Sequence, residues 1–391
     1  MRILFAADVL PDLNSGAAGT ELQTIAGLRR LGHEVDEVWA TDLGRRIKHG
    51  NLHYLLELPY IYRKVIRQKN NEKDYDVVHV NQGHCYLAAK EHRESKRRGI
   101  FVCRSHGLDD HMEMVLKEWR YKLGIKNRSL IKSIPGKIID TLLFRHDRLA
   151  ARYASGFIVS NCLDRDFLIK YHKVPKEHVA CIHQAPPDLF VQTLPVRLNP
   201  ERLRKILYIG GFGYWKSPHI VAEVANELLC EYPKVSFTWV CGKSDHQQVI
   251  QLLNPSARKR IDLVSWTSQK ELLNIYDKNG IFIYPSLFDG FGKVFLEAMA
   301  RGLCVITTRT GGMRDIIRDG KNGFLVDFNN SSMILQKIHY LQDNIEKAEY
   351  ISGQSRSTAE DLTWDRVARE TASFYKKLLV SNCNNQLNSF V

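Results

Sequence analysis

The feature that most constrains this chain is a series of short β-branched runs separated by segments long enough to form helices. In the first half these runs are RILFAAD, HEVDEVWA, DVVHV, IFVCRS, GFIVS and HVACIH. In the second half they are KILYIGG, VSFTWVCG, IDLVSW, GIFIYPS, LCVITT and GFLVD. Strands that alternate with helices and read as nearly continuous apolar runs indicate parallel sheets covered on both faces. The sequence therefore predicts an α/β fold.

The alternation stops once, in the proline-containing stretch APPDLFVQTLPVRLNPERL. A chain of 391 residues is long enough for two domains, each with its own core. We predict one Rossmann-like domain over residues 1–190 and a second over residues 204–363, with a helix at about 364–381 that packs back on the first domain. Ligands of open α/β sheets bind beyond the carboxyl ends of the strands, so two sheets facing across a cleft would hold substrates there.

The composition excludes some classes of protein. Hydrophobic residues make up 44% and charged residues 25% of the chain, and no segment approaches the roughly 18 apolar residues that cross a bilayer. The eight cysteines show no metal-ligand spacing, which favours a reduced, cytoplasmic protein without a metal. The net charge is +13, and residues 1–200 hold 32 Lys and Arg against 23 Asp and Glu. This excess favours an anionic partner, which could be nucleic acid, a membrane surface or a phosphorylated substrate.

The strongest candidate site is YPSLFDGFGKVFLEAMARG, residues 284–302. A buried strand ends there in a turn where Gly290 and Gly292 can adopt positive φ, and a strong helix-forming run follows. Unpaired amides and the positive dipole end of a helix bind anions, and a diphosphate fits such a place. Glu297 lies about five residues into the helix, roughly 7.5 Å from the turn, within reach of a sugar hydroxyl of a bound nucleotide. Asp289 could hold the hydroxyls of a second sugar.

The same stretch also permits a simpler interpretation, in which Lys293, Glu297 and Arg301 form a charged stripe on a solvated helix face. The surrounding chain favours the site. The stretch resembles the signature of the retaining GT-B glycosyltransferases of family four, in which a strand ends in P-S, E-G-F-G follows, and seven residues separate the first Glu from a second Glu. Asp289 replaces the usual first Glu.

The resemblance extends over almost the whole chain. PDLNSGAAGTELQTIAGLRRLGHEV resembles the family's first glycine loop and helix, and SWTSQKELLNIYDKNGIFIYPS and TGGMRDIIRDGKNGFLVD follow its C-terminal domain in order. The resemblance implies a GT-B fold and metal-independent, retaining transfer of a sugar from a nucleoside-diphosphate sugar, with UDP or GDP as the expected nucleotide. The implied acceptor is a glycan or a lipid-linked glycan, in cell-envelope glycan, polysaccharide or glycolipid synthesis.

Site residues follow from the same resemblance. The family has a His near the donor sugar at His106, a Lys that neutralises the diphosphate at Lys216, and an Arg where this chain has Gly211. The first glycine loop closes over donor and acceptor, and a loop at Thr267 contacts the base. The expected catalytic residues are His106, Lys216 and Asp289, and the expected donor-binding residues are Gly16, Gly19, Thr267, Gly290, Phe291, Gly292 and Glu297.

Alternatives exist for several of these features. Without its arginine, the chain could be a sugar-nucleotide-binding protein on the same scaffold with little or no transferase activity. A dinucleotide-binding site fits poorly, because Lys216 occupies the third glycine position of the fingerprint. His106 alone could be a structural histidine. No nucleic-acid-binding module is recognisable.

One segment suits a membrane surface. Residues 112–137 contain Lys117, Arg120, Lys122, Lys126, Arg128, Lys132 and Lys137 together with Trp119 and Tyr121. A basic, aromatic amphipathic surface is typical of proteins that bind anionic lipid, although a solvated helix face has the same composition. The sequence is therefore compatible with a cytoplasmic protein, peripheral at the inner face of the membrane.

Overall fold

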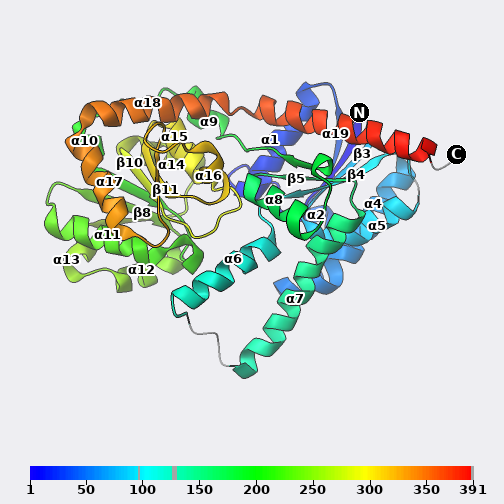
Figure 1. The fold of residues 1–391 in the computed structure, drawn as a ribbon, viewed down its shortest axis with the longest axis horizontal. Coiled ribbons are helices and arrows are strands. Elements are labelled where there is room, and N and C mark those ends of the chain that lie inside the picture. The colour runs from blue at the N-terminus through cyan, green and yellow to red at the C-terminus, as the bar shows by residue number, and fades with distance from the viewer. Residues whose placement is uncertain (96, 126–129, 389–391) are drawn as a thin grey trace. The chain divides into compact units, whose positions relative to one another are not determined.

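The computed structural model describes residues 1–95, 97–125 and 130–388, and the chain forms two compact α/β units (Figure 1). The first unit contains residues 1–183 and the chain from Trp364 onward, and the second contains Gln184–Thr363. Each of the twelve runs singled out in the sequence contains a strand, six in each unit. The predicted α/β class with two Rossmann-like sheets is therefore confirmed.

The first unit is built on a parallel sheet with the strand order β2-β1-β3-β4-β5-β6. Its strands are β1 (Arg2–Ala6), β2 (Glu34–Val38), β3 (Val77–Asn81), β4 (Ile100–Ser105), β5 (Gly156–Val159) and β6 (Val179–Cys181). Its helices are α1 (Gly16–Arg30), α2 (Ala40–Leu43), α3 (Gly50–Leu52), α4 (Leu58–Glu72), α5 (Tyr86–Glu94), α6 (Asp109–Lys122), α7 (Leu130–Tyr153), α8 (Cys162–Tyr171) and α19 (Trp364–Asn388).

Alternate residues of this sheet face opposite layers, as strand geometry requires. Leu4 and Val78 join the core formed with α4, α5 and α7. On the other face, Phe5 stacks on His79, whose Nδ1 lies 2.5 Å from the hydroxyl oxygen of Tyr375 in α19. The C-terminal helix therefore completes the first unit.

Helices α1 and α19 pack closely because Gly27 lacks a side chain. A Cβ atom at Gly27 would lie 2.6 Å from Cβ of Ala368, which is closer than van der Waals contact allows. Nearby, the guanidinium of Arg30 donates to Asp365 Oδ1 at 2.6 Å. The helix that follows the second unit is thus held on α1 by packing and by an ion pair.

The second unit has the strand order β12-β11-β10-β7-β8-β9, again entirely parallel. Its strands are β7 (Lys205–Ile209), β8 (Ser236–Cys241), β9 (Ile261–Ser265), β10 (Ile281–Tyr284), β11 (Cys304–Thr308) and β12 (Phe324–Val326). Its helices are α9 (Asp188–Gln192), α10 (Pro200–Leu203), α11 (Pro218–Glu231), α12 (His246–Leu252), α13 (Pro255–Arg258), α14 (Gln269–Lys278), α15 (Lys293–Ala300), α16 (Gly311–Ile316), α17 (Ser331–Asp343) and α18 (Ile345–Asp361).

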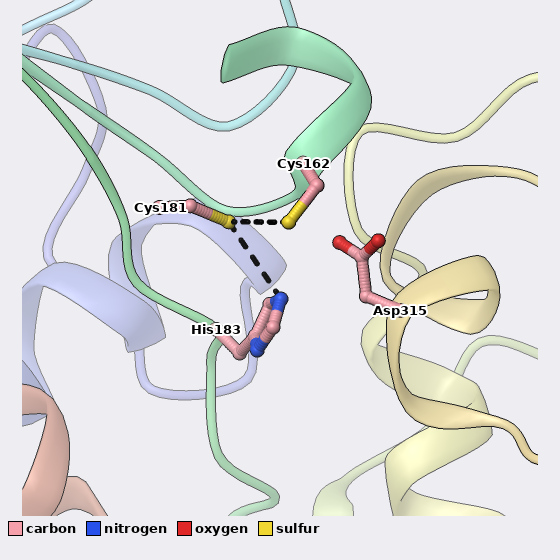
Figure 2. Close-up of side chains that lie close together, drawn as sticks. All are labelled: Cys162, Cys181, His183 and Asp315. Atoms are coloured by element: carbon pink, nitrogen blue, oxygen red, sulfur yellow. Dashed lines mark hydrogen bonds between the residues drawn. The ribbon is translucent and has the colours of Figure 1, made fainter. Parts of the chain in front are cut away.

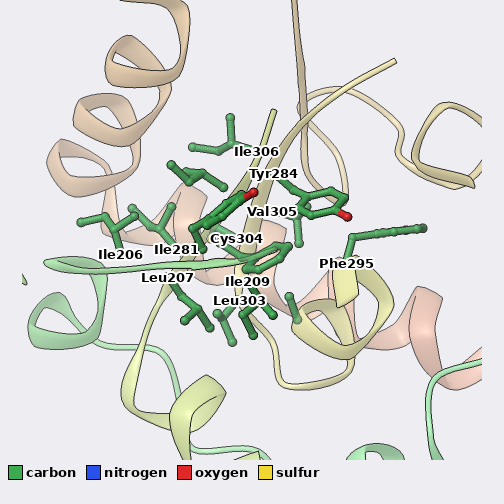
Figure 3. Packing of buried hydrophobic residues seen from close by; sticks show 14 of the residues in the cluster. Ile206, Leu207, Ile209, Ile281, Tyr284, Phe295, Leu303, Cys304, Val305 and Ile306 are labelled. Carbon is green, nitrogen blue, oxygen red and sulfur yellow. The ribbon is translucent and has the colours of Figure 1, made fainter. Parts of the chain in front are cut away.

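The core of the second unit lies around its central strands. Figure 3 shows side chains of β7, β10, β11 and α15 packed together, among them Ile206, Leu207, Ile281, Tyr284, Phe295, Cys304 and Ile306. All are buried, and full burial of a large aliphatic side chain contributes roughly 1.5–3 kcal/mol. The strand order reverses between β7 and β10. Both strands belong to the buried core, so the loops that follow them start from fixed positions.

Among the described residues, none of the helices combines the length and the apolar character that crossing a bilayer requires.

Candidate functional site

The candidate site of the second unit lies where its strand order reverses. Strands β7 and β10 are neighbours in the sheet, and chain connections leave in opposite directions from such a point, which opens a crevice at the carboxyl ends of the strands. Lys216 belongs to a 3₁₀ turn that follows β7, and Asp289 follows β10. The backbone N–H of Leu287 donates to the carbonyl of Trp215 at 2.7 Å, which ties the two loops together.

Lys216 and Asp289 form a polar cluster at this edge of the sheet. Nζ of Lys216 lies 2.5 Å from Oδ2 of Asp289 and donates to the hydroxyl of Tyr284 at 2.7 Å. The Tyr284 hydroxyl in turn donates to Asp289 Oδ2 at 2.7 Å, and the backbone N–H of Phe291 donates to the other carboxylate oxygen at 3.2 Å. Two groups, the Asp289 carboxylate and the Tyr284 hydroxyl, therefore fix the Lys216 ammonium at the switch point.

The surroundings of Asp289 favour its ionised form. Burial by itself would raise the pKa of Asp289, but the Lys216 ammonium, the Tyr284 hydroxyl and the Phe291 amide together hold it below its ordinary value. The pKa of Tyr284 lies well above its ordinary value, because of burial and of the neighbouring Asp289. The Lys216 and Asp289 side chains are 19% and 14% exposed, so a ligand can reach the ammonium.

The glycine turn before α15 is sterically constrained. Gly292 is the N-cap residue of α15 and has a φ of 85°, a conformation that favours glycine. A Cβ atom there would lie 2.6 Å from Sδ of Met313. The first turn of α15 therefore begins close to the Lys216–Asp289 pair, with helix N-terminal amides, the groups that bind anions, at its start.

Glu297 lies inside the unit and not on a solvated face. It is 8% exposed, and the hydroxyl of Tyr276 donates to its Oε2 at 3.0 Å. Burial raises the pKa of Glu297, while Lys293 and the Tyr276 hydroxyl lower it by smaller amounts. The alternative interpretation of Lys293, Glu297 and Arg301 as a solvated charged stripe is wrong, since Arg301 is fully buried as well.

Arg301 has a structural role that the sequence did not reveal. Its guanidinium donates to both carboxylate oxygens of Asp277 at 2.8 Å, and to the carbonyls of Phe190, Thr193 and Leu194 at 3.0, 2.6 and 2.9 Å. A buried charge requires such partners. Arg301 thereby fastens the proline-containing stretch around residue 190 to the second unit.

Two further predicted positions lie at the carboxyl edge of the same sheet. Thr267 is half-buried and lies between β9 and α14, next to the exposed Trp266. Gly211 follows β7, and a Cβ atom built there meets no heavy atom within 4 Å. The space for a side chain at residue 211 is therefore present, although the arginine of the family is absent.

In the first unit, His106 follows β4 and is oriented by a buried carboxylate. Its Nε2 lies 2.6 Å from Oε1 of Glu21, and both Glu21 and Arg104 are fully buried. The Arg104 guanidinium lies 3.4 Å from Oε2 of Glu21 and donates to the hydroxyl of Thr24 at 3.1 Å. Glu21 was assigned no role from the sequence, and no local signal connects it to a histidine 85 positions away.

Glu21 is ionised throughout the physiological range. Burial by itself would raise its pKa, but the charges of Arg104 and His106 lower it to about 2. A permanent carboxylate beside Nε2 makes this nitrogen the one that carries a proton, which fixes the orientation of the His106 ring.

Gly16 and Gly19 begin α1, which is capped by Ser15. The N–H of Gly19 donates to the carbonyl of Ser15 at 2.9 Å, so this amide is already used inside the helix. A Cβ atom at Gly16 would meet nothing within 4 Å. The structure thus brings together Lys216 and Asp289 with the glycine turn and Glu297 in the second unit, while His106, Gly16 and Gly19 belong to the first.

Two Rossmann-like units with polar residues at the carboxyl ends of their strands match the GT-B architecture, and comparisons with known proteins assign the chain to this fold. Residues 193–358 match the family described as Glycosyl transferases group 1. The chain is 28% identical over 380 residues to spore coat protein SA of Bacillus subtilis, covering 94% of this chain and 96% of that protein.

Solved structures share the fold at low sequence identity. Sucrose-phosphate synthase from Thermosynechococcus elongatus superposes with a TM-score of 0.76 at 16% identity, over 97% of this chain and all of that one. Anabaena Alr3699/HepE, solved in complex with UDP-glucose, gives a TM-score of 0.66 at 19% identity over 95% of this chain and 98% of that one. The matched domain, residues 193–358, belongs to the group 1 glycosyltransferases of family four, a retaining and metal-independent family, and the protein is a glycosyltransferase that uses a nucleotide sugar.

Proposed function

We propose that the crevice between the loops after β7 and β10 binds the diphosphate of the sugar nucleotide. The observation that carries this proposal is the fixed ammonium of Lys216, 2.5 Å from Asp289 Oδ2, at the switch point of the sheet and beside a helix N-terminus. A partly exposed cation beside the positive end of a helix suits two phosphate groups. Glu297 is proposed to bind hydroxyls of a sugar.

The roles proposed for Lys216 and the glycine turn follow from the charge that develops on the nucleoside diphosphate during transfer. When the bond between the anomeric carbon and the phosphate oxygen breaks, its electron pair goes to the nucleoside diphosphate, which gains negative charge. Lys216 and the amides of the glycine turn stabilise that charge. The acceptor hydroxyl attacks the anomeric carbon from the same face, and its proton passes to the departing phosphate oxygen. Retention of configuration follows.

His106 is proposed to contact the transferred sugar. Because the Glu21 carboxylate lies 2.6 Å from Nε2, the imidazole has one orientation, and rotation away from it would leave a buried carboxylate without this partner. Gly16 and the first turn of α1 are proposed to lie near the donor or acceptor, and Thr267 near the base.

The nucleotide of the donor and the class of the acceptor go beyond what the family match shows, and both are proposals. We propose UDP or GDP as the nucleotide, with UDP first because a protein of this fold was solved with UDP-glucose. We propose a glycan or lipid-linked acceptor in the cell envelope, supported by the name of the relative spore coat protein SA.

A thermal-shift screen with UDP-, GDP- and ADP-sugars tests the donor site. One nucleotide class is expected to raise the unfolding temperature, since a ligand at 100 times its Kd stabilises by about 2.7 kcal/mol. Lys216→Ala should reduce the shift, and transfer to an added glycan should be measured on the same samples. A nucleotide-dependent shift without turnover would favour the binding-protein alternative, and a shift unchanged in Lys216→Ala would contradict the proposed site.

We also propose that the first unit contacts an anionic surface, through a region other than the segment singled out in the sequence. Of residues 112–137, Lys126 and Arg128 lie outside the described residues, as do the side chains of Lys132 and Lys137. In the described part of α6, Arg120 pairs with Glu113 and Lys122 with Glu118. These pairs leave little net charge there.

A stronger cationic feature lies at the amino ends of β4 and β5. A cavity of about 1050 Å³ is lined there by Arg93, Arg97, Arg98, Arg148, Arg152 and Lys173. Within the described part of the chain, no Asp or Glu lines it. Six cations without a counter-charge attract phosphate groups, and at a membrane each cation near the surface contributes about 1 kcal/mol.

Vesicle sedimentation tests this surface with phosphatidylglycerol against phosphatidylcholine. Salt-sensitive retention on the anionic vesicles is expected, and it should be lost in an Arg98→Gln, Arg148→Gln double variant. Lys117→Gln with Lys122→Gln is the matched control on α6 and should keep most of the retention. Equal retention on both vesicle types, or full retention in the cavity variant, would contradict the proposal.

A further inference from the structure

Two cysteine sulfurs and one histidine nitrogen lie close together at the carboxyl edge of the first sheet, outside the candidate sites described above. Sγ of Cys162 lies 3.6 Å from Sγ of Cys181, and Sγ of Cys181 lies 3.6 Å from Nε2 of His183 (Figure 2). All three side chains are half-buried. Asp315, also drawn in Figure 2, belongs to the second unit and is not used in this argument.

The distances match the edges of a tetrahedral zinc site. With Zn–S bonds of about 2.3 Å and Zn–N bonds of about 2.0–2.1 Å, tetrahedral angles place two sulfurs about 3.8 Å apart and a sulfur and a nitrogen about 3.6 Å apart. The sulfurs are too distant for a disulfide bond of about 2.05 Å. The Cys162 sulfur and the His183 nitrogen also lie within 4.8 Å of each other, so a single ion can reach all three atoms.

Local structure explains why these side chains converge. Cys181 ends β6, and His183 follows two residues later on the same side of the chain, as the two-residue strand period requires. Cys162 is the first residue of α8, behind the N-cap residue Asn161, whose side chain accepts from the N–H of Asp164 at 2.9 Å. The positive end of a ten-residue helix favours a thiolate.

The backbone of the third ligand is also held in place. Arg366 of α19 donates from its guanidinium to the carbonyl of His183 at 2.6 Å. Cys162, Cys181 and His183 thus derive from three separate segments, α8, β6 and the following loop, and the loop is anchored to α19. Because the backbone of these ligands is already fixed, an ion that binds them loses little free energy to the ordering of the chain.

We propose that Cys162, Cys181 and His183 bind a soft divalent cation of the zinc class, with two thiolates and one imidazole nitrogen as ligands and the fourth position open to water. Binding converts the two thiols to thiolates and releases their protons, and no electron transfer is involved. Two sulfurs and one nitrogen select zinc or cobalt over magnesium or calcium, which prefer oxygen ligands.

A bound ion would restrict the motion of the chain at the end of the first unit. His183 is the last residue of the first unit before the chain continues into the second unit at Gln184. The ion would tie this residue to the start of α8 and the end of β6. The proposed role of the site is therefore structural, and glycosyl transfer as described above does not depend on it.

Cobalt(II) titration of the reduced, metal-free, full-length protein tests the site. Wild-type protein is expected to bind one equivalent of Co²⁺, with a thiolate-to-metal charge-transfer band and the visible bands of tetrahedral cobalt, and added Zn²⁺ should abolish both. Cys181→Ser should lose the charge-transfer band and bind at least roughly tenfold more weakly. Cys162→Ser and His183→Ala should weaken binding as well.

The matched control is Cys230→Ser, because Cys230 is an exposed cysteine of the second unit, and it should bind Co²⁺ like wild type. Far-UV circular dichroism and thermal unfolding of each variant identify those that fail to fold. Wild-type protein without a thiolate band, or a band unchanged in Cys181→Ser, would overturn the proposal. Formation of a Cys162–Cys181 disulfide without any metal binding would overturn it in favour of a redox pair. Nucleotide-dependent stabilisation measured in parallel reports on the donor site independently.

Discussion

Nζ of Lys216 lies 2.5 Å from Oδ2 of Asp289, although the two residues are 73 positions apart in the chain. The pair joins the loops that follow two neighbouring strands, β7 and β10. Tyr284, at the end of β10, bonds to both members. An ammonium held in this way is already oriented when an anion arrives, so little of the binding free energy is spent on ordering the side chain.

Removing this ammonium should slow transfer strongly. For Lys216→Ala we expect kcat to fall by about 10²–10³, the loss typical of one group that stabilises charge in a transition state. Steady-state transfer assays measure this effect. Lys259→Ala removes an exposed lysine of the same unit and should leave the rate within about twofold of wild type. A Lys216→Ala enzyme that retained most of its activity would show that another group stabilises the leaving diphosphate.

The open space at Gly211 allows an arginine to be introduced. No heavy atom lies within 4 Å of a Cβ atom built at Gly211, so Gly211→Arg should fold. A second cation beside Lys216 should tighten the binding of a nucleoside diphosphate by about tenfold, because a hydrogen bond to a charged group contributes about 1.5–3 kcal/mol. Isothermal titration calorimetry measures the change, with Gly211→Ala as control. Unchanged affinity in Gly211→Arg would indicate that the diphosphate lies elsewhere.

Buried His79 should make the first unit sensitive to acid. Burial, together with the charges of Arg104 and His106, lowers the pKa of His79 to about 3, against 6.5 for a free imidazole. Below pH 6.5 the unfolded chain takes up a proton that the folded chain does not accept until about pH 3, so stability is lost as the pH falls through this range. At pH 4.5 the loss is roughly 2–3 kcal/mol.

Chemical unfolding at pH 7 and pH 4.5 tests this prediction. His79→Phe should be less stable than wild type at pH 7, because it loses the contact with Tyr375, but its stability should fall less on acidification. His49 is exposed, and His49→Gln should keep the wild-type pH dependence. An equal pH dependence in His79→Phe and wild type would refute the assignment of the acid sensitivity to this imidazole.

The buried Arg301 should matter for stability and not for chemistry. Arg301→Ala leaves Asp277 and the carbonyls of Thr193 and Leu194 without this donor, and removal of one partner of a buried ion pair costs about 3–5 kcal/mol. The free energy of unfolding of the second unit measures the loss. Arg318→Ala, at an exposed arginine, should change it by less than about 0.5 kcal/mol. A small loss in Arg301→Ala would mean that water replaces the guanidinium.

Much of the fold follows from the sequence because its signals are local. Each strand of a covered parallel sheet is a short apolar run, and such runs are visible without knowledge of their neighbours. The proximity of Lys216 and Asp289 was predictable for a related reason. In a parallel sheet the carboxyl ends of all strands meet at one edge, so Lys216 after one run and Asp289 after another had to lie near the same edge.

The contacts that were missed are those that join distant segments. Glu21 lies on α1 and His106 follows β4, and only the order of the strands brings them within 2.6 Å. The sulfurs of Cys162 and Cys181 lie in two different elements, so the absence of a ligand-spacing motif in the sequence carried no information about their proximity. Arg301 was read as part of a charged stripe because helix periodicity does not reveal which face is covered.

A crystal structure of the protein with a nucleoside-diphosphate sugar tests the central claim most directly. The diphosphate oxygens should lie within about 3 Å of Lys216 Nζ and of amides at the start of α15, with a sugar hydroxyl at a similar distance from Glu297. Diphosphate density away from the loops after β7 and β10, with Lys216 still bonded only to Asp289 and Tyr284, would contradict the account.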